Sequence, residues 1–85
     1  MIRVSLFASL REVAGTSEIA LPTAKALTAR EVFDTLVSER PTLERLRPVT
    51  LVAVDDEFAS WDTVVSPDGE VAFFPPVSGG AAWSA

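Results

Sequence analysis

The sequence predicts a small α+β domain in two layers, in which one helix packs on one face of a sheet of about four or five strands. The chain has 85 residues, which is the size of a single domain. Apolar and polar residues alternate near both ends, as they do in strands that bury one face. One central segment instead has apolar residues three and four positions apart, which is typical of an amphipathic helix.

The first expected strand covers residues 2–8, whose side chains alternate between two faces. One face is apolar throughout and is expected to point into the core. The other carries Phe7 beside polar residues, so this ring is expected on the solvent side. The apolar face consists of Ile2, Val4, Leu6 and Ala8.

A short helical turn and a second strand are expected next. The spacing of Ser9 and Glu12 is that of a capping box, which predicts a turn of helix over residues 10–14. Gly15 is expected to end this turn, because glycine adopts the left-handed conformation at helix ends without strain. Residues 17–21 then alternate as a strand.

The main helix is expected over residues 29–39. Thr28 and Glu31 form a second capping box, and an apolar stripe at helical spacing follows them. Pro41 is expected to stop this helix, since the residue before a proline avoids the helical region. Residues 42–46 are expected to form another helical turn, which the next proline ends.

The last third of the chain is expected to be mostly β. Residues 50–54 are rich in β-branched side chains and predict a buried strand. The acidic residues 55–57 are expected to form a solvated turn, and residues 58–65 a short strand region. Residues 66–69 predict a turn in which glycine supplies a positive φ. Residues 70–74 form the last expected strand.

The composition excludes several classes of function. The chain contains neither Cys nor His, so disulfides, thiolate metal sites, Cys nucleophiles and Ser–His pairs are excluded. We therefore expect no metal site and no autonomous hydrolase. The net charge is −5 and Lys25 is the only lysine, so no basic stripe is available for nucleic acid. An acidic domain of this kind is suited to a basic protein partner.

The location expected from the sequence is the cytoplasm. The first residues lack the basic and apolar segments of a signal peptide. No apolar run reaches the length of about 18 residues that a membrane span needs. We therefore expect no contact with a membrane.

The segment after the last strand is suited to entering a narrow channel. Pro75 and Pro76 favour an extended start with little conformational freedom left to lose. Gly79 and Gly80 then leave the tip without side chains, so the final carbonyl carbon is sterically open. A flexible terminal spacer would have the same composition, and the spacing alone does not separate the two interpretations.

Two parts of the chain resemble one known family. The sequence E-V-A-F-F-P-P-V-S-G-G, residues 70–80, resembles the C-terminal signature of the MoaD/ThiS sulfur-carrier family, in its MoaD branch. The sequence I-R-V-S-L-F-A-S-L-R-E-V-A-G, residues 2–15, is similar to the same family, as are residues 51–54 and Trp61. The resemblance extends over about residues 2–80.

The resemblance implies a ubiquitin-like β-grasp fold with a mixed sheet. In that fold the first and last strands lie side by side and parallel at the centre of the sheet. The implied organisation is a β-grasp domain over residues 1–74, a carrier tail over 75–80 and an extension over 81–85.

The resemblance also implies the chemistry. Members of this family act as the small subunit of molybdopterin synthase, and they bind no cofactor of their own. An ATP-dependent, MoeB-like activating enzyme adenylates the terminal glycine, here Gly80, and sulfur then replaces the adenylate. The resulting thiocarboxylate donates sulfur to cyclic pyranopterin monophosphate in a large catalytic, MoaE-like subunit. The chain itself is thus expected to be the sulfur donor rather than the catalyst.

Interface residues are expected near the root of the tail. Phe7 and Phe74 both occupy solvent-side positions of their strands, so two neighbouring strands would form an exposed aromatic patch. Phe58 resembles a further interface position of the family, and Arg11 a basic one. The residues expected to occupy the partner's channel are Pro75, Pro76, Val77, Ser78 and Gly79, with Gly80 bearing the sulfur.

The chain departs from the family after the second glycine. The family ends there, whereas this chain continues with A-A-W-S-A over residues 81–85, which places Gly80 in a peptide bond. The extension is interpreted as a propeptide that a protease removes, as the stub of a fusion, or as a sign that the carrier role is lost. Two other functions stay open: a sulfur carrier for thiamine or cysteine synthesis, and a ubiquitin-like modifier or binding module.

Overall fold

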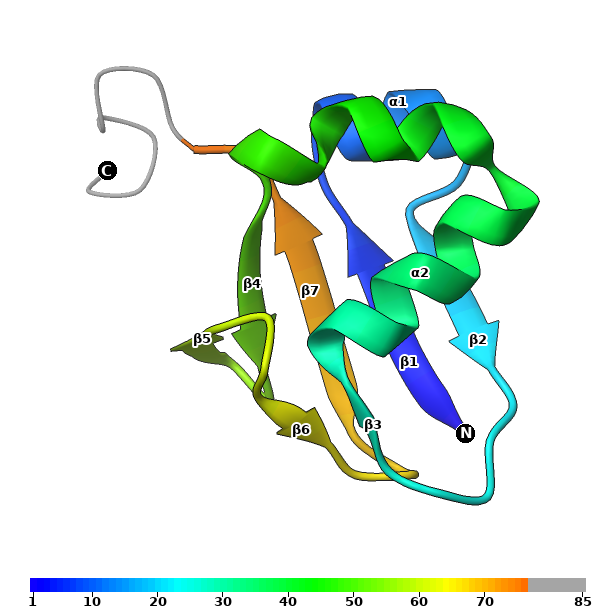
Figure 1. Ribbon diagram of the computed structural model, residues 1–85, viewed down its shortest axis with the longest axis vertical. Coiled ribbons are helices and arrows are strands. Elements are labelled where there is room, and N and C mark those ends of the chain that lie inside the picture. The colour runs from blue at the N-terminus through cyan, green and yellow to red at the C-terminus, as the bar shows by residue number, and fades with distance from the viewer. Residues whose placement is uncertain (77–85) are drawn as a thin grey trace.

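The computed structural model describes residues 1–76 and has two layers, a sheet and a helix, as predicted (Figure 1). The helix is α2 (Ala29–Glu39), which crosses one face of the sheet. The strands of the sheet are β1 (Ile2–Leu6), β2 (Glu18–Leu21), β4 (Leu51–Val54), β5 (Glu57–Ala59) and β7 (Glu70–Phe74).

The five strands are arranged in the order β2-β1-β7-β4-β5. The central pair β1 and β7 is parallel, with Val4 opposite Val71 and Leu6 opposite Phe73. All other pairs in this sheet are antiparallel. The mixed sheet and the parallel pairing of the first and last strands are therefore confirmed.

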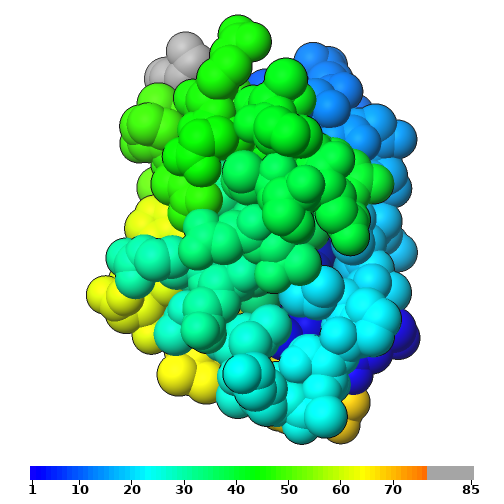
Figure 2. All heavy atoms as spheres, turned by 45° about the vertical axis from the view of Figure 1, so that its right-hand side comes forward, coloured from blue at the N-terminus to red at the C-terminus, as the bar shows by residue number. Residues whose placement is uncertain are grey.

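Smaller elements complete the described part of the chain. A short helix, α1 (Ser9–Ala14), joins β1 to β2, and a 3₁₀ helix, η1 (Pro41–Val49), follows α2. The short strands β3 (Leu27–Thr28) and β6 (Val64–Val65) pair beside the start of α2. In the space-filling view, atoms of α2 and η1 cover most of the sheet on their side (Figure 2).

The core lies between α2 and the inward side chains of the sheet. Alternation along each strand supplies these side chains, and helical periodicity supplies the apolar stripe of α2. Burying one large apolar side chain contributes about 1.5–3 kcal/mol, so this layer dominates the stability of so small a domain. Its fully buried members include Ile2, Val4, Leu6, Val32, Phe33, Leu36, Val71 and Phe73.

Three aromatic rings form the centre of this core. Phe33 meets Phe73 edge to face, with ring centroids 5.0 Å apart, and meets Trp61 in the same way at 5.3 Å. Trp61 also stacks on Phe73 at 5.7 Å. These geometries are the ones that aromatic pairs prefer, so the cluster joins α2, β7 and the β5–β6 loop.

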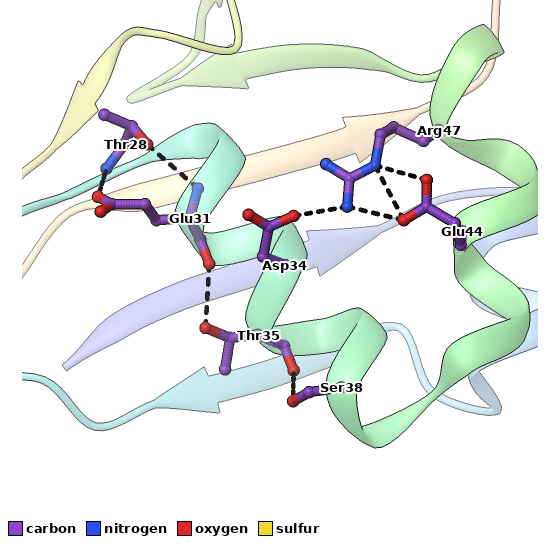
Figure 3. A network of polar contacts seen from close by, with 7 residues as sticks. All are labelled: Thr28, Glu31, Asp34, Thr35, Ser38, Glu44 and Arg47. Carbon is purple, nitrogen blue, oxygen red and sulfur yellow. Dashed lines mark hydrogen bonds and ion pairs between the residues drawn. The ribbon is translucent and has the colours of Figure 1, made fainter.

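Arg47 of η1 closes the edge of the aromatic cluster. Its guanidinium lies 4.8 Å from the centre of the Phe33 ring, and it pairs with Asp34 at 2.6 Å and with Glu44 at 2.9 Å (Figure 3). The hydrogen bond to Glu44 raises the pKa of Arg47 above its usual value, and the bond to Asp34 acts in the same direction. Arg47 thereby holds η1 against α2 by charge and by ring contact.

The start of α2 matches the prediction closely. The Glu31 backbone N–H donates to Thr28 Oγ1 at 3.1 Å, and the Thr28 N–H donates to the Glu31 carboxylate at 2.9 Å (Figure 3). The capping box and the helix over residues 29–39 are thus confirmed.

The capping box predicted at Ser9 is wrong. Ser9 lies inside α1, and Ala8, with φ of 52°, precedes the helix without a side-chain cap. Backbone carbonyls accept instead, because Leu10 N donates to Phe7 O at 3.1 Å and Glu12 N to Ala8 O at 3.0 Å. The predicted helix end is confirmed at Gly15, whose φ is 81°.

Two further local predictions are corrected. The turn expected over residues 42–46 is longer, since η1 runs from Pro41 to Val49; Pro48 lies inside it and does not end it. Gly69 does not have a positive φ. Glycine avoids crowding in this turn, since a Cβ there would lie 3.0 Å from the Ser66 hydroxyl oxygen and 3.2 Å from the Ser66 carbonyl oxygen.

Candidate functional site

The face of the sheet opposite α2 is named here the open face, and no helix formed by residues 1–76 lies over it (Figure 1). Alternation places the odd residues of β1 and β4 and the even residues of β7 on this face. Three small residues lie side by side across its middle, because Ser5 is paired with Ala72 and Ala72 with Ala53. The next partner in this row is Phe58 of β5, opposite Ala53.

Aromatic and aliphatic side chains gather at one end of the open face, named here the apolar end. Phe58 is 78% exposed, Phe7 51% and Leu51 42%. Phe7 and Phe58 line an open hollow of about 230 Å³. The lining of this hollow consists of Phe7, Ala53, Asp56, Phe58, Ala72 and Phe74.

The apolar end lies where the chain leaves the sheet. Phe7 N donates to Phe73 O at 3.2 Å, so Phe7 sits beside the carboxyl end of β7. Pro75, half-buried, and Pro76, exposed, continue directly from that end. The predicted tail residues 77–80 and the extension 81–85 lie outside the described residues.

The structure brings together three of the four predicted interface residues. Phe7, Phe58 and Phe74 line one hollow, whereas Arg11 is exposed on α1 and does not line it. The expected exposure of Phe74 is wrong, since this side chain is only 4% exposed. The Phe58 ring lies 5.9 Å from that of Phe74, so one ring of the expected patch lies beneath another.

Leu51 was missed by the sequence reasoning. Residues 50–54 predict a fully buried strand, but only alternate residues of β4 face the core, with Val52 and Val54 buried and Leu51 exposed. Leu51 is the register partner of Phe74 and extends the apolar end. The sequence of this strand does not alternate between apolar and polar residues, because Leu51 and Ala53 are apolar like their buried neighbours. Its pattern therefore does not show that Leu51 faces solvent.

The other end of the open face carries carboxylates, and is named here the acidic end. A second hollow of about 110 Å³ is lined in part by Asp55, Asp56 and Glu70 and shares Phe7, Ala53, Asp56 and Ala72 with the first. Both aspartates have positive φ, at 50° and 70°, in the tight turn between β4 and β5. The predicted acidic turn is confirmed at Asp55 and Asp56, whereas Glu57, which was expected in the turn, is the first residue of β5.

The described residues hold no group of three or more Asp or Glu side chains placed to bind a metal ion. Within residues 1–76, no helix has the length and apolar character that crossing a membrane requires. What the open face does offer is a shallow apolar surface bordered by charge, which is the anatomy of a protein-binding surface.

Solved structures with the same fold include two archaeal proteins. The crystal structure of SAMP1 from Haloferax volcanii has a TM-score of 0.78 and 32% sequence identity, and covers 93% of this chain and 98% of that one. The solution structure of small archaeal modifier protein 1 from Methanosarcina acetivorans has a TM-score of 0.77 and 26% identity, and covers 93% and 95%. The predicted ubiquitin-like β-grasp fold is thereby confirmed.

Sequence relatives agree with this result. A protein of Escherichia coli (strain K12) named molybdopterin synthase sulfur carrier subunit is 39% identical over 84 residues, covering 94% of this chain and all of that protein. A protein of the same name from Arabidopsis thaliana is 34% identical over 79 residues, covering 93% of this chain and 82% of that protein. The ThiS family matches residues 4–80. The chain therefore belongs to the ThiS family.

Proposed function

We propose that this chain is the sulfur carrier subunit of a molybdopterin synthase. Relatives of that name match it over nearly its whole length. The observation that carries the proposal is the position of the apolar end beside the carboxyl end of β7. A partner that covers this surface meets the start of the tail at the same point, and the tail leads in sequence to Gly79 and Gly80.

The proposed organisation assigns one role to each segment. Residues 1–74 form the docking domain, residues 75–80 form the tail that enters the partner's channel, and residues 81–85 are removed by a protease. Removal is required because a peptide bond after Gly80 leaves no carboxylate to activate.

The proposed reaction cycle takes place on Gly80. Its carboxylate attacks the α-phosphorus of ATP in the activating enzyme, and pyrophosphate leaves. A sulfur nucleophile then displaces AMP, which yields a thiocarboxylate. The thiocarboxylate sulfur bonds to a carbon of the pterin precursor as the bond from that carbon to an oxygen substituent breaks and the oxygen group leaves. Hydrolysis of the acyl–sulfur bond returns the carboxylate and leaves the sulfur on the pterin.

The proposed partner on the open face is the large, MoaE-like subunit. Exposed apolar area for this contact is supplied by Phe7, Phe58 and Leu51. The Phe58 ring packs against the buried ring of Phe74. Arg11 on α1 is assigned to the margin of the same contact. Large rings at the centre of an interface commonly contribute most of its binding energy.

The deciding experiment is the intact mass of the chain isolated without a tag from cells that are making the cofactor. The expected masses end at Gly80, either as the carboxylate or heavier by the difference between sulfur and oxygen. If every molecule retains residues 81–85 under these conditions, the carrier role is excluded.

A modifier function is the second candidate, because SAMP1, at 32% identity, is a similar solved structure. In that case Gly80 forms an isopeptide bond with a lysine of a target protein. Lysine-linked conjugates that depend on Gly80 would select this function. Copurification with a large synthase subunit, without conjugates, would select the carrier. A sulfur carrier for another pathway would form the thiocarboxylate but not bind that subunit.

A further inference from the structure

The open face changes from apolar to acidic along the direction of β7. Phe74 lies at the apolar end and Glu70 at the acidic end of the same strand. Four residue steps in a strand separate them by about 13 Å. A third hollow, of about 320 Å³, adjoins the acidic end on the side of β2 and is lined in part by Arg3, Glu18 and Glu70. Glu18 is the register partner of Ser5, so it reaches this hollow from the middle row of the face. The hollows at and beside the acidic end are thus lined by four carboxylate side chains, those of Glu18, Asp55, Asp56 and Glu70.

These carboxylates are only partly compensated within the described residues. Of residues 1–76, two with a cationic group line these hollows: Arg3, which is paired with Glu70, and Met1, whose terminal ammonium is paired with Asp68. The Asp55 carboxylate accepts a hydrogen bond from Glu70 N at 3.0 Å, so it has a structural role in the turn. Asp56 is exposed and lines both the apolar and the acidic hollow, so its carboxylate lies at the boundary between the two ends.

We propose that this polarity orients the partner on the open face. The partner then presents an apolar surface to Phe7 and Phe58 and arginine or lysine side chains to the carboxylates that begin at Asp56 and continue to Glu70. Glu70 lies about 13 Å from Phe74 along β7. Docking in the reversed direction would press the carboxylates against apolar surface, which is costly. The acidic end thus keeps the root of the tail directed toward the partner's reaction site. This inference rests on the proposed function, since the partner is the large subunit.

The test measures association of the chain, as isolated from its cells, with the large subunit of molybdopterin synthase from the same organism. Asp56→Asn removes the charge and keeps a residue type that tolerates positive φ. Glu39→Gln at the end of α2 is the matched control, because it changes the net charge equally but lies on the helix layer. Glu18→Gln on β2 is a second acidic-end variant, in case Asp56→Asn alters the turn. The melting temperature of each variant checks its folding.

The expected result at low ionic strength is an association rate about two- to fivefold lower for Asp56→Asn, with Glu39→Gln close to the original chain. The difference should disappear at high salt, because screening removes it. Equal rates for the original chain and both acidic-end variants, or an equal loss in Glu39→Gln, would overturn the orientation by charge and leave the proposed function intact. Failure of the original chain to bind the large subunit at all would overturn the proposed function, and this inference with it.

Discussion

The two faces of the sheet use aromatic residues in opposite ways. On the covered face, Phe33 and Phe73 are fully buried and pack edge to face with their centroids 5.0 Å apart. On the open face, Phe58 and Phe7 leave 78% and 51% of their area exposed. Phe73 on β7 and Phe58 on β5 therefore serve different ends, because strand alternation sends their side chains to opposite sides of the sheet.

This contrast shows that the residues that stabilise the fold and those available for recognition lie on opposite faces of the same sheet. On the covered face, α2 and Arg47 pack over the apolar side chains, so burial of this area contributes to the free energy of folding. The open face leaves its apolar area to be buried by a partner. Substitutions on the two faces should therefore change different measured quantities.

The largest effect is expected from Phe73→Ala on the covered face. Removal of this ring leaves a cavity between Phe33 and Trp61, and the free energy of unfolding should fall by about 3–5 kcal/mol. Urea denaturation followed by circular dichroism measures the loss. The matched change on the open face, Phe58→Ala, should cost less than about 1 kcal/mol of stability. Equal losses for the two variants would refute the separation of the faces.

The next effect is expected in binding rather than stability. Phe58→Ala should weaken binding of the large synthase subunit by about 1–3 kcal/mol, since an exposed ring at the centre of the surface is lost. Isothermal titration calorimetry measures this change. Val64→Ala is the control, because Val64 is 60% exposed but lies on β6, outside the open face. A similar loss in both variants would argue against a specific role of the apolar end.

A smaller effect is expected at the edge of the covered face. Arg47→Ala removes the ring contacts and the pairs with Asp34 and Glu44, and should lower the free energy of unfolding by about 1–2 kcal/mol. Arg47→Met keeps an apolar stem and should recover part of this loss. The exposed pair of Arg30 and Asp62 provides the comparison, because Arg30→Ala should cost less than about 0.5 kcal/mol. Thermal denaturation of the three variants gives the ranking.

An effect smaller than that of Arg47→Ala is expected at the start of α2. Thr28→Ala removes the hydroxyl that accepts from Glu31 N and should cost about 1 kcal/mol of stability. Thr28→Ser keeps the hydroxyl and should retain most of the stability. Neither change should alter binding on the open face. A binding defect in Thr28→Ala, at temperatures where it is folded, would show that the two layers are coupled.

Most of the fold was predictable because its elements are specified locally. The limits of α2 follow from the capping box and the apolar stripe, and those of β7 from the alternation and the prolines after it. The parallel pairing of β1 and β7 was expected only from the family resemblance. Periodicity alone does not say which strands are neighbours.

The site was predictable in part. Alternation correctly placed Phe7 and Phe74 on the open face, but it carries no information on which side chain covers another. The pairing of β4 with β5 brings the Phe58 ring to 5.9 Å from that of Phe74, and Leu51 is the register partner of Phe74 across β4 and β7. These contacts join segments far apart in the chain.

The sequence by itself determined the helix, the strands, the acidic balance and the glycine tail, since each depends on neighbouring residues or on composition. Only the tertiary structure decided which aromatic rings are exposed, that Arg47 completes the core, and that an apolar and an acidic end share one face. Those properties arise from strand order and register. They depend on the free energy of the whole packed chain rather than on any one segment.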